Sequence, residues 1–275
     1  MTGVLPDPLV SVLEEGRQVH LAVDSRHGPH VTPELYAWSG GRLWFAAATT
    51  TLKAKVLRRR PVAGAVVTVR GRSMVVSGEV TAYAPWRPLE LAAHLRDLPA
   101  ATRALAWFSL RNATDLAAFG RDTLTGRTGW RPPPPRTWFA LRPVGAALVE
   151  GDRVVERWRW AVPQPVGTGR AEAPPSGGLA AVAALPGPVA VPGSWFPDDR
   201  ILRVPAEVLG LAGLPRRFPM SVVTDEYRAP GPAAKRGALV RGEGWLDAER
   251  AGVVHVEPRR VVHWAGTETS STPTG

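Results

Sequence analysis

The chain has 275 residues, 44% of them hydrophobic, which is enough for one large domain or two small ones with a buried core. It contains no cysteine, so disulfide bonds and thiolate nucleophiles are excluded. The net charge is +10, but the arginines are spread along the chain without interleaved aromatic residues, which argues against nucleic acid as a partner.

The N-terminal stretch predicts no targeting or membrane segment. Residues 1–16 carry acidic side chains and lack the basic-then-apolar order of a signal peptide. No apolar run approaches the length that spans a bilayer. We therefore expect a cytoplasmic protein without membrane contact, whose basic surface attracts anionic small molecules.

The first third of the chain predicts a mainly β structure. A short amphipathic helix is expected over 7–16. Strands are expected over 19–23, 31–38, 43–47, 62–69 and 73–80, with hairpin signals between them. Pro61 ends a short helix that separates the third of these strands from the fourth.

That short helix begins with hydroxyl and basic side chains. Thr51 and Lys53 stand at its start, where backbone N–H groups, a hydroxyl and an ammonium together suit a phosphate. Thr49 and Thr50 are weaker candidates. The alternative is that Lys53 and Lys55 are solvated residues of a surface helix.

Residues 88–121 change from strand to helical periodicity, and Pro99 is expected to separate two helices. These helices either pack on a barrel flank, which we favour, or form a lid that brings Trp107 and Phe108 near a cofactor. An extended connector over 126–136 follows. Strands resume at 138–141, 146–149 and 152–160.

A Pro- and Gly-rich stretch divides the chain, and the part after it resembles the part before it. We expect domains at 1–160 and 179–270, a linker at 161–178 and a tail at 271–275. Spacing matches Gly28-Pro29, Pro33, Phe45, Gly78 and Pro143 with Gly187-Pro188, Pro192, Val204, Gly242 and Pro258. The Lys53 position falls on Ala212, and no threonines accompany it.

The first half resembles the flavin-binding split β-barrel family, which includes pyridoxamine 5′-phosphate oxidase and the actinobacterial flavin and deazaflavin oxidoreductases. The matching residues are Gly28–Pro33, Leu43–Phe45, Thr51–Ala54, Leu57–Pro61 and Val75–Gly78. The resemblance covers 19–80 and returns near 138–149.

This resemblance implies a fold and an oligomeric state. The fold class is mainly β with flanking helices: two split β-barrels in tandem, which form an intrachain pseudo-dimer in place of the family's homodimer. The chain would then be a monomer or a weak homodimer. Only its first half would hold a phosphate motif, and the second half would supply the opposite wall of the site.

The resemblance also implies a cofactor, FMN as first choice and a deazaflavin as second. Thr51 and Lys53 would contact the phosphate. The isoalloxazine ring would lie along His30, Val31, Thr32 and Pro33, with Ala46 and Ala47 facing it and Ser73 at its edge. Two departures are Leu52, where the oxidase has an arginine, and the absence of the vitamin-binding pattern.

These residues predict an FMN-dependent oxidoreductase of unknown substrate, acting on a small molecule or with a small-molecule electron donor. The alternatives are a deazaflavin-dependent reductase and a non-catalytic flavin- or heme-binding protein. No catalytic side chain is assigned, because a flavin itself accepts the hydride. The six histidines show no metal-ligand spacing, and no nucleophile-elbow sequence is present.

Overall fold

The structure is a computed structural model. It describes residues 4–85, 92, 94–125, 135–160, 178–209, 214–227, 230, 234–266 and 268–274. Most of the predicted connector over 126–136 and of the linker over 161–178 lies outside these residues, as does much of the predicted helix before Pro99.

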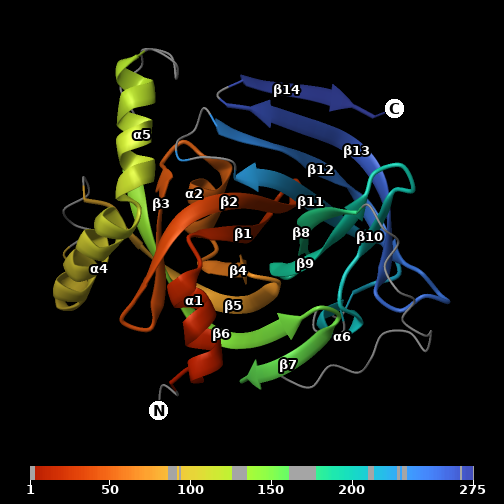
Figure 1. Cartoon of the computed structure of the whole chain (residues 1–275), viewed down its shortest axis with the longest axis horizontal. Helices are drawn as coiled ribbons and strands as arrows, with labels where there is room; N and C mark the ends of the chain where they lie inside the picture. The colour runs from red at the N-terminus through yellow and green to blue at the C-terminus, as the bar shows by residue number, and fades with distance from the viewer. Residues whose placement is uncertain are drawn as a thin grey trace.

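The described chain forms two β-rich halves with helices at their margins (Figure 1). The elements of the first half are α1 (Asp7–Glu15), β1 (Gln18–Ser25), β2 (Gly28–Ser39), β3 (Arg42–Ala48), α2 (Leu52–Leu57), β4 (Val62–Val69), β5 (Arg72–Tyr83), a 3₁₀ turn (Leu95–Asp97), α4 (Leu98–Arg111), α5 (Ala113–Leu124), β6 (Arg136–Glu150) and β7 (Arg153–Trp158). Those of the second half are β8 (Leu179–Leu185), β9 (Val189–Phe196), β10 (Ile201–Arg203), α6 (Ala206–Leu209), β11 (Phe218–Tyr227), β12 (Lys235–Leu246), β13 (Val253–Ala265) and β14 (Glu268–Pro273).

Each half is a closed six-stranded barrel with one extra strand. The first sheet runs β3-β2-β1-β4-β5-β6, a β3–β6 pairing closes it, and β7 adds to the outside of β6. The second runs β10-β9-β8-β11-β12-β13, a β10–β13 pairing closes it, and β14 adds to β13. The two strand orders are the same, so the predicted tandem barrels are confirmed. The predicted tail is corrected, because β14 continues the sheet to Pro273.

The ladders show which residues are equivalent in the two barrels. His20 pairs with Pro33, and Val182 pairs with Pro192, at the same place in the β1–β2 and β8–β9 ladders. Gly78 pairs with Pro143 beside a register shift, and Gly242 pairs with Pro258 beside another. Both halves therefore contain the same bulge.

Two expectations about these strands need correction. The predicted strands 138–141 and 146–149 are one strand, β6, because the bulge places Pro143 where the ladder does not need its missing N–H. Phe45 corresponds to Leu202 and not to Val204: Tyr36 pairs with Phe45 as Trp195 pairs with Leu202. The strand arms of the β9–β10 hairpin are shorter than those of the β2–β3 hairpin, which moves the match by two residues.

The first barrel is filled by the inward-facing residues of its strands. Phe45 and Phe139 stack across the β3–β6 pair with ring centroids 5.3 Å apart, and both are fully buried. Helix α1 covers one side of the barrel with Leu9 and Leu13. The buried Tyr36 hydroxyl donates to the Leu13 carbonyl oxygen over 2.8 Å, which satisfies its polar end.

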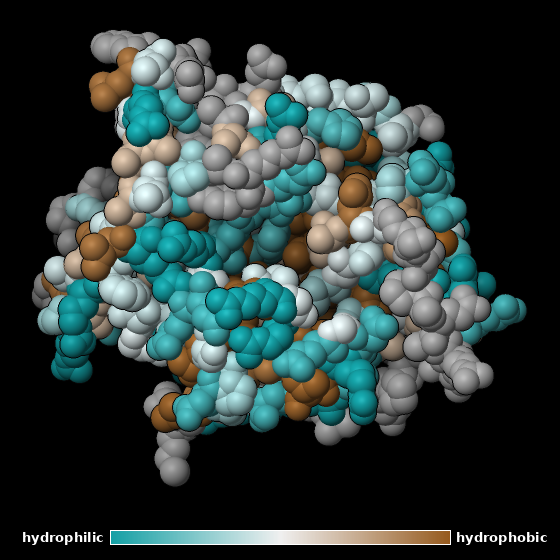
Figure 2. Space-filling view, in the orientation of Figure 1, coloured by the Kyte–Doolittle hydropathy of each residue, from teal (hydrophilic) through white to brown (hydrophobic). Residues whose placement is uncertain are grey.

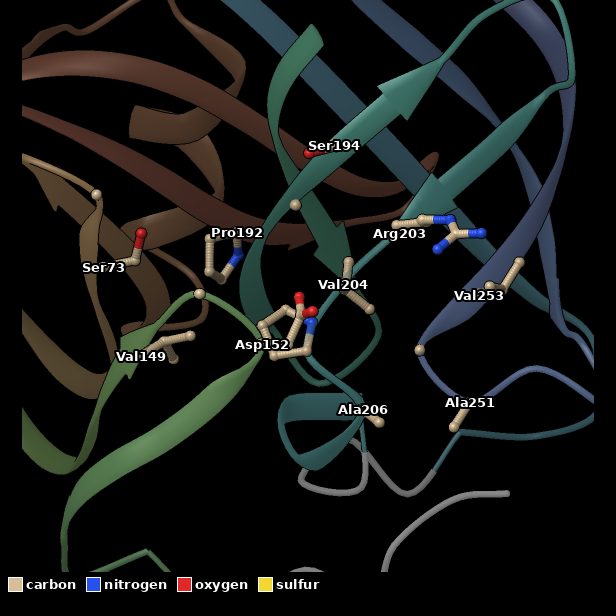
Figure 3. A pocket seen from close by; sticks show the side chains of 15 residues that line it. Ser73, Val149, Asp152, Pro192, Ser194, Arg203, Val204, Ala206, Ala251 and Val253 are labelled. Atoms are coloured by element: carbon tan, nitrogen blue, oxygen red, sulfur yellow. The ribbon is translucent and has the colours of Figure 1, made fainter. Parts of the chain in front are cut away.

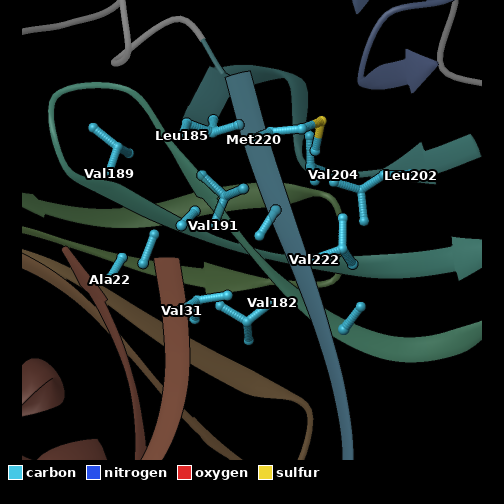
Figure 4. Close-up of a cluster of buried hydrophobic side chains, with 14 of the residues drawn as sticks. Ala22, Val31, Val182, Leu185, Val189, Val191, Leu202, Val204, Met220 and Val222 are labelled. Carbon is cyan, nitrogen blue, oxygen red and sulfur yellow. The ribbon is translucent and has the colours of Figure 1, made fainter. Parts of the chain in front are cut away.

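The two barrels pack through the outward faces of their sheets. Ala22 and Val31 of the first barrel join a buried cluster with Val182 and Val191 of the second (Figure 4). Gly64 of β4 lies so close to β9 that an added Cβ would be 2.6 Å from the Pro188 carbonyl oxygen. Strands β2 and β11 meet on the other side of the contact, as the equivalents of β9 and β4. This is the arrangement of a pseudo-two-fold dimer within one chain.

Polar side chains connect the barrels beside this apolar contact. The His20 Nε2 and Asp225 Oδ1 atoms are 2.5 Å apart, and the Gln18 amide donates to the other carboxylate oxygen. Burial raises the pKa of Asp225, but these hydrogen bonds outweigh it, so the pKa lies below its ordinary value. The carboxylate is therefore a paired ion at the interface.

The helical insertion packs against β2, β3 and β6. Pro99 lies in the first turn of α4, where a missing N–H is tolerated, and the helix expected before it lies mostly outside the described residues. A break falls at Asn112, between α4 and α5. Phe108 is buried edge-on against Trp138 at 5.0 Å, whereas Trp107 is 44% exposed. No described helix is long and apolar enough to cross a membrane.

Candidate functional site

The first barrel is split between β2 and β3. Residues 28–35 of β2 pair with β1, and only residues 36–39 pair with β3. Helix α2 connects β3 to β4 and packs against both β1 and β3. Thr32 and Glu34 lie opposite the core residues Leu21 and Val19 on β1, so their side chains point to the barrel side of β2.

Lys53 of α2 reaches these two side chains. Its Nζ atom is 3.1 Å from the Thr32 hydroxyl and forms an ion pair with the Glu34 carboxylate. Lys53 is only 8% exposed, whereas Lys55 is exposed. The alternative of a solvated Lys53 is therefore wrong, and Lys55 points elsewhere as expected for a residue two positions on. We call Lys53, Thr32 and Glu34 the Lys53 site.

Two more cations act on this lysine. Burial, together with the positive charges of Lys235 and Arg136, lowers the pKa of Lys53 to about 7. Arg136 begins β6 beside Ala48, and its guanidinium lies 5.5 Å from the centre of the Phe119 ring. Lys235 begins β12 of the second barrel. We call Lys53, Arg136 and Lys235 the cation cluster.

The members of this cluster come from different parts of the chain. Burial also lowers the pKa of Arg136, and it lowers that of Lys235, where the charges of Asp115 and Asp225 act in the opposite direction. Sequence reasoning identified Lys53 but missed Arg136 and Lys235. No local motif marks those two residues, because the fold alone brings them near Lys53.

His30 also lies at the contact of β2 with the second barrel. Its Nδ1 accepts a hydrogen bond from Nη2 of Arg241 over 2.9 Å. Burial lowers the pKa of His30 to about 3, with smaller contributions from the charges of Arg241 and Lys53. The ring is therefore neutral at physiological pH, and it faces the cations as an acceptor.

Thr51 serves as the N-cap of α2. Its hydroxyl accepts from the Ala54 N–H over 3.4 Å and donates to the Ala48 carbonyl oxygen over 2.8 Å. A phosphate contact of this hydroxyl stays a prediction. In the protein without ligand its role is to begin the helix that carries Lys53.

The predicted ring contacts do not all face one side. Ala47 belongs to the core of the first barrel and Val31 to the contact between barrels, whereas Ala46 points to the opposite face of β3 from Ala47. Pro33 is half-buried beside His20. Side chains of neighbouring strand residues alternate, so a run such as 30–33 offers a flat ligand mainly its backbone and every second side chain.

Ser73 lies away from the Lys53 site. It lines a cavity of about 380 Å³ with Pro192, Ser194 and Arg203 of the second barrel (Figure 3). Its Oγ is 2.9 Å from the Thr68 hydroxyl. The structure therefore separates Ser73 from the other predicted site residues. The β4–β5 hairpin that carries Ser73 faces β9 and β10 of the second barrel and not the Lys53 site.

A buried hydroxyl that the sequence did not single out lies on β6. Thr137 is fully buried opposite Ala47, and its Oγ1 has no hydrogen-bond partner within the described structure. An orphaned buried hydroxyl costs free energy unless something outside the chain satisfies it. Thr137 adjoins Arg136 in sequence, but neighbouring side chains of a strand alternate, so the Thr137 hydroxyl points to the face of β6 opposite from the Arg136 side chain.

In the described part of the chain, no group of three or more His, Asp or Glu side chains could hold a metal ion.

On the face shown in Figure 2 the surface is hollowed between the two barrels, and hydrophilic residues rim much of the hollow.

Comparisons with known proteins give structural likenesses alone. No family model matches the chain, and no curated protein matches its sequence. It is similar to a pyridoxamine 5′-phosphate oxidase-related, FMN-binding protein from Nostoc punctiforme, with a TM-score of 0.40, 16% identity, and 55% of this chain and 86% of that chain covered. It is also similar to an F420 reductase, with a TM-score of 0.34, 21% identity, and 52% and 98% covered.

A third similar structure is a protein related to general stress protein 26 from Clostridium acetobutylicum, with a TM-score of 0.37, 13% identity, and 55% and 92% of the two chains covered. The fold described above rests on the strand pairings of this chain and not on these likenesses.

Proposed function

We propose that the chain is an oxidoreductase that binds one FMN at the Lys53 site, with a deazaflavin as the second choice of cofactor. The observation that carries the proposal is the convergence of Lys53, Arg136 and Lys235, three cations from α2, β6 and the second barrel. Placing such charges together in a half-buried region costs free energy, and an anionic ligand would offset that cost. The sequence resemblance supplies the identity of the ligand.

The residues fit the phosphate of such a cofactor. The oxidase pattern has an arginine where Leu52 stands, and Arg136 offers a guanidinium from a different element, with the two-pronged geometry that suits phosphate oxygens. In the protein without ligand, Glu34 provides the anionic partner of Lys53, so a phosphate would take over that role.

The chain's own residues would orient the cofactor more than they would react. A bound flavin or deazaflavin supplies hydride transfer. The small side chain of Ala46 leaves room for a flat ring near β3, and backbone groups of β2 beside Thr32 would meet its polar edge. His30 is neutral and its Nδ1 already accepts from Arg241, so we give it a positioning role and no role in proton transfer.

Flavin titration of matched lysine variants tests this proposal. Lys53→Ala removes a charge-assisted contact of about 1.5–3 kcal/mol, so FMN should bind about ten- to a hundredfold more weakly. Lys55→Ala is the control, because the exposed Lys55 side chain points away from the site. Arg136→Ala should weaken binding in the same way as Lys53→Ala. If wild type and Lys53→Ala have the same affinity for FMN and the same affinity for the deazaflavin, Lys53 does not contact a phosphate and the proposed site is wrong.

A redox assay separates the enzyme from a binding protein. The FMN-loaded wild type should bleach on addition of NAD(P)H, or the protein loaded with reduced deazaflavin should pass its hydride to an acceptor dye. If the protein binds flavin at the Lys53 site but exchanges no electrons with these partners, the proposed binding site stands and the proposed enzymatic activity is overturned.

We also infer that the two barrels arose by tandem duplication. The shared strand order and the shared bulge opposite Pro143 and Pro258 support this origin. Because the main barrel contact is internal, a monomer should be stable in solution. If light scattering showed an obligate dimer, the internal barrel contact would not have replaced a subunit interface.

A further inference from the structure

Helix α5 carries carboxylates on its inward face and leucines on its outward face. Asp115 and Asp122 are buried, whereas Leu116 and Leu124 are 41% and 85% exposed. A helix that packed on the barrel through an apolar stripe would show the reverse pattern. Buried carboxylates need positive charge or hydrogen-bond donors nearby, so the polar groups that α5 faces determine its orientation.

The inward face of α5 meets two members of the cation cluster. Asp115 and Phe119 are four residues apart and therefore lie on one face of the helix. The charge of Asp115 raises the pKa of Lys235 against the effect of burial. The Arg136 guanidinium lies over the Phe119 ring, 5.5 Å from its centre, which is within the range of a cation–π contact. Helix α5 therefore contacts Arg136 directly and acts on Lys235 through its charge.

The start of α5 is fixed to the first barrel. The Asn112 amide, at the junction of α4 and α5, donates to the Phe108 carbonyl oxygen over 2.9 Å and to the Tyr36 carbonyl oxygen of β2 over 3.3 Å. Asn112 is itself buried. Because Phe119 lies two helical turns beyond this anchor, its ring has a defined position beside Arg136.

The Phe119 ring is the only hydrogen-bonding, ionic or ring partner of the Arg136 guanidinium among the residues that the structure describes. A ring attracts the positive charge through its π face, and it does not use up the N–H groups as a carboxylate would. The N–H groups of Arg136 are therefore held in one region and remain for phosphate oxygens.

The second barrel lacks both this helix and the cations that it faces. The first barrel connects β5 to β6 through residues 84–135, which include α5, whereas the second connects the equivalent β12 and β13 through residues 247–252. Counted along the equivalent strands, Arg136 corresponds to Ala251 and Lys235 to Gly71. Ala251 and Gly71 both line the cavity that contains Ser73. The helix and the two cations are thus present together at one position and absent together from the other.

We propose that α5 is part of the anion site and that Phe119 is a positioning residue, which holds the Arg136 guanidinium in place for the phosphate of the cofactor. This inference rests on the proposed FMN site and adds the helical insertion to it. Helix α4 packs on β2 and β3, as expected for the insertion, whereas α5 acts on the cation cluster.

A comparison of FMN with riboflavin, which lacks the phosphate, tests this role on the full chain. The ratio of the two dissociation constants measures the contribution of the phosphate alone. Phe119→Leu removes the aromatic face and should lower this ratio about three- to tenfold, with riboflavin affinity unchanged. Phe119→Tyr retains the ring and should retain the wild-type ratio. Leu116→Ala, on the exposed face of α5, is the control and should also retain it.

A double variant shows whether Phe119 acts through Arg136. In the Arg136→Ala background, Phe119→Leu should lower the ratio no further. If Arg136→Ala lowers the ratio and Phe119→Leu does not, or if Phe119→Leu has the same effect with and without Arg136, the role of Phe119 is overturned while the phosphate site stands. If wild type binds FMN and riboflavin equally, the phosphate site itself is wrong and this inference is overturned with it.

Discussion

Two sites lie between the barrels at pseudo-symmetric positions, and they differ in charge while their backbones correspond. At the Lys53 site, Lys53, Arg136 and Lys235 concentrate positive charge. In the cavity that contains Ser73, the equivalent positions of the latter two are Ala251 and Gly71, and Arg203 replaces Ala46. A homodimer must keep its two sites identical, whereas a fused pair can change one without the other. In this chain the two positions therefore differ in charge.

The largest predicted effect concerns the contact that keeps the two halves together. Gly64 and Ser221 are equivalent positions in the β4 and β11 ladders. An added Cβ at Gly64 would lie 2.6 Å from the Pro188 carbonyl oxygen, so Gly64→Ala should lower the free energy of unfolding by about 2–3 kcal/mol. Chemical denaturation measures this change.

The equivalent position in the second barrel gives the matched control. The fully buried Ser221 already has a side chain, and its hydroxyl has no hydrogen-bond partner within the described structure. Ser221→Ala should therefore leave stability unchanged or raise it by up to about 1 kcal/mol. A destabilisation as large as that of Gly64→Ala would show that the two sides of the contact are equivalent after all.

A second prediction concerns stability in acid. It depends on His30, whose equivalent in the second barrel is the non-titratable Val189. Burial and neighbouring cations lower the pKa of His30 from 6.5 to about 3, so between these values the unfolded chain binds a proton that the folded chain does not. The free energy of unfolding should fall as the pH falls from 6.5 to 3, with a slope of up to about 1.4 kcal/mol per pH unit from this group alone.

His30→Gln should lose that part of the pH dependence, and His27→Gln is the control because His27 is exposed on the β1–β2 turn. The measurement is the denaturation midpoint at a series of pH values. An unchanged pH profile in His30→Gln would mean that the imidazole is already charged in the folded protein.

How far the sequence predicts this molecule depends on the range of each signal. Alternating strands and Gly–Pro spacings are local signals, and the two tandem barrels followed from them. In the sequence, Pro143 suggests a break between two strands. The bulge that keeps β6 continuous can be recognised only once Gly78 is known to pair with Pro143.

The content of the sites was less predictable for a related reason. Arg136 and Lys235 are far from Lys53 in sequence, and only the packing of the two barrels brings their charges to it. The family resemblance alone placed Ser73 at the edge of the flavin ring, and no pattern in the sequence shows which of the two positions between the barrels it faces. In the fused pair, the hairpin end of β5 faces the second barrel's site and not its own.

The third prediction uses the lowered pKa of Lys53, which has no counterpart among the described residues that line the cavity. A phosphate favours the protonated ammonium, so FMN affinity should be constant just below pH 7 and then fall by up to about tenfold per pH unit as the free Lys53 loses its proton. Between pH 7 and 9 the phosphate itself is already doubly charged.

Lys53→Arg keeps its charge over this range, so its affinity for FMN should stay flat from pH 7 to 9. Lys55→Arg is the control and should reproduce the wild-type decrease. The measurement is the dissociation constant from fluorescence quenching at each pH. A decrease of equal steepness in Lys53→Arg would assign the titration to another group.

The stoichiometry of flavin binding tests the difference between the two sites most directly. Titration of the full chain with FMN should give one equivalent per chain; Lys53→Ala should weaken this binding, and Arg203→Ala should leave it unchanged. Two equivalents of similar affinity per chain, or a single equivalent weakened by Arg203→Ala and not by Lys53→Ala, would contradict the account.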